Sequence, residues 1–150
     1  MAGTFNTGGL NAPPKTIVNK FSVGGVTGIA LGSANNYNKV TLSGALTANT
    51  YLEMLNVAGS GVLNVAYVYT VDTTSRTVGI KVVIDGVTIF DAISAALTTT
   101  TDGIMAVGVS IGGHIIFEPI CYNSSLIIYI KSSISETNKI GVCYGYRTTS

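Results

Sequence analysis

Hydrophobic and polar residues alternate along most of the chain from Val40 onward, and turn-forming residues separate the alternating runs. Alternation with a period of two is typical of half-buried β-strands. In the segment 61–71 it predicts one face that carries Leu63, Val65, Tyr67 and Tyr69. In the segment 125–133, "SLIIYIKSS", it predicts that Tyr129 and Lys131 point outward and that three residues point inward, Leu126, Ile128 and Ile130.

The clearest local signal is the stretch "IKVVIDGVTIF", which spans residues 80–90. Asp-Gly between two apolar runs is typical of a two-residue β-hairpin turn, because both turn positions require positive φ. This register sets Ile84 opposite Val87 and Val82 opposite Ile89. It predicts one continuous apolar face made of Val78, Ile80, Val82, Ile84, Val87 and Ile89.

Roughly eight such strands follow one another, and no segment shows a clear helical period. The segment 91–103 predicts a loop that crosses between sheets, and the last strand near the C-terminus directs four residues to one side: Ile140, Val142, Tyr144 and Tyr146. The pattern predicts an all-β protein with a single β-sandwich of jelly-roll type. We assign this domain to residues 21–150.

Residues 1–20 differ from the rest because they are rich in Gly, Asn, Thr and Pro. The Pro-Pro pair favours an extended path, so we interpret this segment as an N-terminal arm. An arm that attaches the domain to a partner would contact it through its apolar residues, Phe5, Leu10, Pro13, Pro14 and Ile17. The alternative is a terminus that contacts nothing.

Charged residues make up 10% of the 150 residues, against about 25% in a typical soluble domain. With a formal net charge of +1, such a surface resists self-association poorly. We therefore expect an obligate oligomer, with a monomer coated by Thr and Ser as the alternative. The basic residues are scattered and form no run, which argues against a nucleic-acid partner.

No apolar run reaches the ~20 residues that span a bilayer, so we expect no membrane insertion. The first residues lack the apolar core of a signal peptide, which predicts a protein made in a cytoplasm and not exported by that route. Cys121 and Cys143 are too few for a disulfide framework. Two reduced cysteines fit such a compartment, and pairing would require neighbouring strands.

The chain shows no convincing catalytic or metal-binding pattern. His114 is the only histidine, and no serine, cysteine or carboxylate lies near it in a triad-like arrangement. One histidine and two separated cysteines do not make the usual zinc set. Asp72, Asp85 and Asp102 fall in turns or loops and lack calcium-loop spacing. We expect neither enzymatic activity nor a cofactor, with a small hydrolase that uses His114 as the remote alternative.

Eight tyrosines and no tryptophan are typical of an interface or a sugar-binding face. Tyr67 and Tyr69 fall on an apolar face and predict core or inter-subunit packing. A second set of residues is predicted to be exposed and to face a ligand, namely Tyr122, Asn123 and Tyr129.

The stretch from Tyr51 to Asp91 resembles a segment of tailed-bacteriophage virion proteins. In those proteins a "G-x-G-x-L" strand start is followed by a loop and a "K-x-x-I-D-G-V-x-x-F" hairpin; here the two motifs span residues 59–63 and 81–90. The closing "NSSLIIYIKSS" and "NKIGVCYGYR" are similar to the last two strands of that family. The resemblance covers residues 51–147.

The resemblance implies a small jelly-roll β-sandwich, commonly a homotrimer, in a head fibre, a capsid decoration protein or a tail fibre. It brings no catalytic residues. This chain has a short arm and no coiled-coil or β-helical shaft, which favours a compact decoration or head-fibre protein over a long fibre. The expected partners are further copies of the chain and the major capsid protein or another virion protein, with localisation in the virion. The alternative is a tail-fibre module that binds a host surface glycan.

Overall fold

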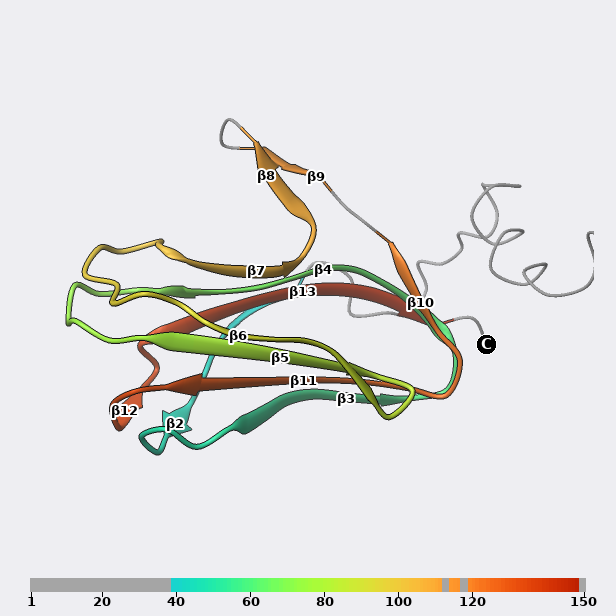
Figure 1. Cartoon of the computed structure of the whole chain (residues 1–150), viewed down its shortest axis with the longest axis horizontal. Coiled ribbons are helices and arrows are strands. Elements are labelled where there is room, and N and C mark those ends of the chain that lie inside the picture. The colour runs from blue at the N-terminus through green and yellow to red at the C-terminus, as the bar shows by residue number, and fades with distance from the viewer. Residues whose placement is uncertain (1–38, 112–113, 117–118, 149–150) are drawn as a thin grey trace, which may run out of the picture.

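The computed structural model describes residues 39–148 except 112–113 and 117–118, and these residues form antiparallel β-strands without a helix (Figure 1). The predicted arm, residues 1–20, and the predicted start of the domain at residue 21 lie outside the described residues. Eight strands form the framework of the two main sheets: β1 (Lys39–Leu42), β3 (Leu52–Ala58), β4 (Gly61–Thr70), β5 (Val78–Ile84), β6 (Val87–Ile93), β7 (Gly103–Val107), β11 (Ser125–Ser132) and β13 (Ile140–Thr148).

The pairing of these eight strands is that of a jelly roll. The first pairs with the last (β1 with β13), the second with the seventh (β3 with β11), the third with the sixth (β4 with β7) and the fourth with the fifth (β5 with β6). The long antiparallel ribbon then wraps, so that β13 also pairs with β4 and β11 also pairs with β5. One sheet has the order β1-β13-β4-β7 and the other β3-β11-β5-β6. The predicted all-β jelly-roll sandwich is confirmed.

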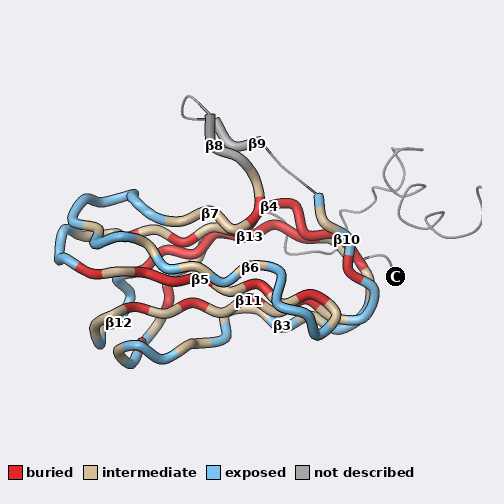
Figure 2. Tube along the Cα trace, in the orientation of Figure 1, coloured by how far each residue is buried: buried red, intermediate tan, exposed pale blue. Residues whose placement is uncertain are grey.

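The core lies between the two sheets, and Figure 2 shows buried positions along β4, β13, β5 and β11. In β11, alternate residues are buried, as the sequence predicts, while Tyr129 and Lys131 point outward. Fully burying each of the large aliphatic side chains contributes roughly 1.5–3 kcal/mol. The strands contribute to one cluster, whose largest buried members include Leu63, Val68, Val78, Ile80, Val82, Leu126, Ile128, Ile130, Ile140 and Val142.

The predicted face of the central hairpin is correct for β5 and wrong for β6. Ile84 pairs with Val87 as predicted, but Val82 pairs with Phe90 instead of Ile89. Ile89 is an extra residue at a β-bulge, and the bulge reverses which residues of β6 face the core. Ile89 is consequently 41% exposed, whereas Val87 is 63% exposed because it begins the edge strand β6 beside the turn.

A second irregularity corrects the prediction for β4. Leu63 pairs with Tyr146 and Val65 with Gly145, so Asn64 has no opposite residue on β13. Leu63 therefore points into the core, whereas Val65 is absent from the core cluster. Tyr67 follows Val65 onto the outer face.

Five short strands complete the described structure: β2 (Ala45–Leu46), β8 (Val109–Ile111), β9 (His114–Ile116), β10 (Ile120–Tyr122) and β12 (Glu136–Thr137). β2 and β12 pair with each other, and β10 extends the first sheet beside the start of β4. β8 and β9 form a hairpin that projects from the sandwich, with Ile111 opposite His114 (Figure 1). The loop predicted at 91–103 is shorter in the structure: residues 94–102 cross between the sheets, while residues 91–93 belong to β6 and Gly103 begins β7. In the described part of the chain, no helix is long and apolar enough to cross a membrane.

Candidate functional site

The three residues predicted to face a ligand do not lie together. Tyr122 is fully buried, so its predicted exposure is wrong. Its ring packs against Gly61, where a Cβ would lie 2.4 Å from the phenol oxygen, and its hydroxyl donates to the Arg147 carbonyl at 3.2 Å. Asn123 is exposed in the turn after β10, while Tyr129 is half-buried in the middle of β11.

Asn123 belongs to a structural turn around Asp85. The backbone N–H groups of Asn123, Ser124 and Ser125 donate to the Asp85 carboxylate at 2.7–3.0 Å. These donors, that of Ser124 first, hold the pKa of Asp85 at about 2. The hairpin turn is thereby tied to the start of β11, a contact between residues ~40 positions apart that periodicity does not reveal.

Tyr129 belongs to an outward-facing group that we call the tyrosine–lysine cluster: Tyr51, Lys81, Asp91, Tyr129 and Lys131. Three of its members form a row across the second sheet, because Tyr129 of β11 pairs with Lys81 of β5, and Lys81 pairs with Asp91 of β6. Opposite residues of antiparallel strands share a face. The sequence indicated the outward direction of Tyr129 and Lys81, but not that β11 and β5 would be neighbours.

Tyr51, which directly precedes β3, contacts the other members of the tyrosine–lysine cluster. Its hydroxyl donates to the Asp91 carboxylate, and burial, together with that bond, raises the pKa of Tyr51. The Lys81 ammonium lies 4.2 Å from the Tyr51 ring centroid and 4.8 Å from that of Tyr129, and the Lys131 ammonium lies 4.4 Å from Tyr51. The two rings meet edge to face at 6.3 Å. The cluster offers two cations and two aromatic rings on one exposed sheet face.

The outer face of the other sheet carries a different surface, which we call the uncharged face. Its outward positions across β1, β13, β4 and β7 carry no charge as far as Gly145: Leu42, Val65, Tyr67, Tyr69, Gly103, Met105, Gly141, Cys143 and Gly145. The next outward residue of β13, Arg147, bounds this face with a cation. Leu42 is 47% exposed, and both tyrosines are partly exposed. The sequence predicted that Tyr67 and Tyr69 pack in a core or between subunits, and they lie outside the core.

Tyr67 and Tyr69 are held on the uncharged face by contacts with β13 and with each other. The Tyr69 ring lies over Gly141, where an added Cβ would be 2.2 Å from the ring. Tyr67 lies opposite Cys143, and the two ring centroids of Tyr67 and Tyr69 are 5.8 Å apart. Burial, with smaller effects from Cys143 and Tyr69, raises the pKa of Tyr67 to about 12. The Tyr67 hydroxyl therefore stays neutral near pH 7.

The two cysteines are both free. They lie on β10 and β13, which flank opposite sides of β4, so their strands are not neighbours. Cys143 is buried as a small hydrophobe, whereas Cys121 is exposed. Burial raises the pKa of both thiols.

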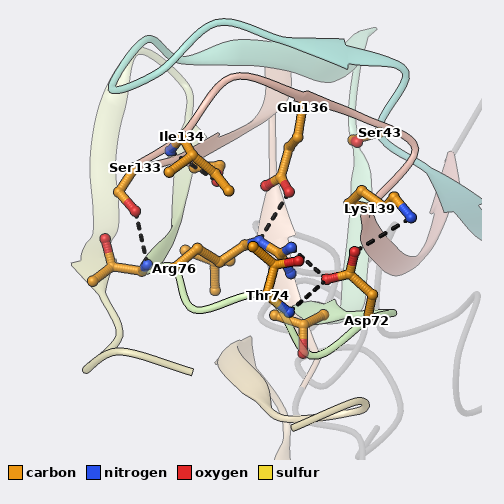
Figure 3. Close-up of polar contacts among 12 residues, drawn as sticks. Ser43, Asp72, Thr74, Arg76, Ser133, Ile134, Glu136 and Lys139 are labelled. Carbon is orange, nitrogen blue, oxygen red and sulfur yellow. Dashed lines mark hydrogen bonds and ion pairs between the residues drawn. The ribbon is translucent and has the colours of Figure 1, made fainter. Parts of the chain in front are cut away.

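Figure 3 shows a cluster of four charged residues: Asp72, Arg76, Glu136 and Lys139. Arg76 is 2% exposed, and its Nε lies 2.8 Å from Oε2 of Glu136, although the angles of this ion pair fall outside hydrogen-bonding geometry. A second guanidinium nitrogen donates to Asp72, which also lies 3.3 Å from the Lys139 ammonium. The bond from Arg76 is the main cause of the lowered pKa of Asp72.

The charged cluster joins the loop after β4 to β12 and to the start of β13, so it has a structural role. Its carboxylates are engaged by Arg76 rather than open to a substrate. In the described residues, no group of three His, Cys, Asp or Glu side chains is positioned to hold a metal ion. The backbone of His114 lies in the projecting hairpin.

Comparison with known proteins adds little to this geometry. No protein-family model and no curated protein matches the chain. A solved structure, that of dimeric latent PorU from Porphyromonas gingivalis, is similar over 78% of this chain with 9% sequence identity and a TM-score of 0.29. The matched region spans 14% of that chain.

Proposed function

We propose that the protein is a non-enzymatic structural protein of a bacteriophage virion, a homotrimeric capsid decoration or head-fibre protein. The observation that carries the proposal is the uncharged face, which presents Tyr67, Tyr69 and Leu42 on the outside of a jelly-roll sandwich. Interface cores are depleted in charge and enriched in aromatic residues. The virion context rests on the resemblance of residues 51–147 to phage virion proteins.

In this proposal the uncharged face packs against neighbouring copies of the chain. Gly103, which is exposed opposite Tyr69, adds no side chain to this face, so another subunit can approach the rings there. Tyrosine side chains supply large contact area at low cost in conformational entropy. The low overall charge removes the repulsion that keeps most small domains apart.

The association is tested by measuring the mass of the full chain in solution by light scattering. We expect three times the 15.5 kDa chain mass. Tyr69→Lys places a charge on the uncharged face and should give a folded monomer, as judged by circular dichroism. Thr88→Lys adds the same charge at an exposed position of β6 and should stay trimeric. A monomeric wild-type chain, or a trimeric Y69K variant, would refute this interface.

Residues 1–20 supply the attachment in this proposal, through Phe5, Leu10, Pro13, Pro14 and Ile17 on the capsid or another virion protein. Deleting residues 2–20 should leave three chains in the oligomer. It should abolish incorporation of the protein into particles. Normal incorporation of the truncated protein would remove the attachment role of the arm.

A receptor-binding, tail-fibre module that recognises a host glycan is the second candidate. The tyrosine–lysine cluster favours it, because this cluster lies on the outer face of the sheet that does not carry the uncharged face. It would stay accessible when the uncharged face is packed. A glycan array separates the two candidates, since a protein with only a decoration role should show no specific signal.

A further inference from the structure

We propose that the tyrosine–lysine cluster is a binding site for an acidic saccharide, whose carboxylate is held by Lys81 and Lys131. This inference deepens the second candidate function. It does not depend on self-association through the uncharged face.

The charge distribution of the cluster is the first argument. Within the described residues, Arg76 and Lys139 form ion pairs with carboxylates, whereas Lys81 and Lys131 form none. Both of their ammonium groups instead lie within 4.4 Å of the Tyr51 ring centroid. Two ammonium groups without an ion-pair partner therefore lie beside one ring, and each can form a direct contact with an external anion.

Tyr51 keeps Lys81 free of an ion pair. Asp91 lies directly opposite Lys81 in the strand register, which is where a cross-strand ion pair forms. The Asp91 carboxylate instead accepts the Tyr51 hydroxyl. Since that hydroxyl stays protonated, it occupies the carboxylate and leaves the Lys81 ammonium available to an external anion.

The neighbouring groups favour a sugar over a nucleic-acid backbone. Glu53, which is exposed, lies opposite Tyr129, and Asp91 flanks the other side of the row, so a run of phosphates would meet two carboxylates. The same carboxylates accept hydrogen bonds from sugar hydroxyls, and the exposed amide of Asn56, bonded to Glu53 at 3.2 Å, adds a further polar group. Tyrosine rings suit the apolar face of a pyranose. The flat sheet predicts weak binding per site, which several copies on one particle would strengthen.

The test is calorimetric titration of the full chain at low salt with matched pairs of sugars that carry one carboxylate or none: galacturonic acid against galactose, and sialyllactose against lactose. We expect binding to at least one acidic member and about tenfold weaker binding to its neutral partner, the loss of a charge-assisted contact. Lys81→Gln and Lys131→Gln should each weaken acidic binding by a similar factor. Lys139→Gln removes the same charge elsewhere and should leave it unchanged.

Two further variants separate the proposed role of Tyr51 from general disruption of the surface. Tyr51→Phe frees Asp91 to pair with Lys81 and should weaken acidic binding several-fold. Adding Asp91→Asn to Tyr51→Phe removes the carboxylate that competes for Lys81 and should restore binding of the acidic sugar. No binding of either acidic sugar, equal binding of the neutral partners, or tighter binding of a single-stranded oligonucleotide would overturn the proposal. The trimer mass is read separately, so failure here leaves the assembly proposal intact.

Discussion

Replacing Arg76 by Met should destabilise the sandwich strongly, although the two side chains have similar length. Arg76 is 2% exposed and Glu136 has a side-chain exposure of 6%, so the substitution leaves a buried carboxylate without its cation. Removing one partner of a buried ion pair typically costs about 3–5 kcal/mol, because the remaining charge stays desolvated. For a chain of this size that corresponds to a fall in melting temperature of roughly 6–20 °C.

The assay is denaturant unfolding followed by circular dichroism for R76M, E136Q and the double variant, at one protein concentration because the stability of an oligomer depends on concentration. We expect the double variant to lose less unfolding free energy than the two single variants lose together, with a coupling free energy of about 1–3 kcal/mol. Lys139→Gln removes a half-exposed partner of Asp72 and should cost less than about 1 kcal/mol. The reasoning is refuted if R76M unfolds within about 1 kcal/mol of the wild type.

Two further predictions follow from the turn around Asp85 and from the cysteines. Asp85→Asn keeps a residue type that tolerates the positive φ of 52° but removes the carboxylate. Because the folded-state pKa of Asp85 is lowered to about 2, its contribution is complete above the ordinary pKa and is lost as the pH falls through the folded value. D85N should therefore melt below the wild type at pH 7, with a difference that shrinks between about pH 4 and pH 2; a difference independent of pH would contradict this. A maleimide should label one thiol per native chain, Cys121, and two after unfolding; labelling of Cys143 in the native protein, located by peptide mass, would contradict the burial of β13.

The fold class was predictable because period-two alternation survives in most strands. β11 shows this best: its inward and outward residues are those that the alternation assigns. The hairpin turn at Asp85-Gly86 was predictable because only a few residue types adopt positive φ at both positions.

The faces of β4 and β6 were not predictable, because one extra residue at a bulge reverses the alternation that follows it. Asn64 and Ile89 each sit opposite no residue, and nothing in their local sequence differs from a regular strand. Tyr122 was misassigned for a related reason: its burial depends on Gly61, a residue 61 positions earlier on the paired strand.

The tyrosine–lysine cluster shows where sequence reasoning stops at a candidate site. Its members come from β5, β6, β11 and the residue before β3, and the wrapping of the jelly roll brings these segments together. Alternation indicates that Lys81 and Tyr129 point outward, but the strand order that makes them neighbours is a property of the whole fold.

The central claim is that the protein is part of a virion, and it is tested most directly by imaging a gold-labelled antibody against residues 39–148 on particles from an infected lysate. The proposal predicts label distributed over the particle head. Label confined to the tail would contradict the decoration role in favour of the receptor-binding module, and intact particles without label would contradict the virion assignment itself.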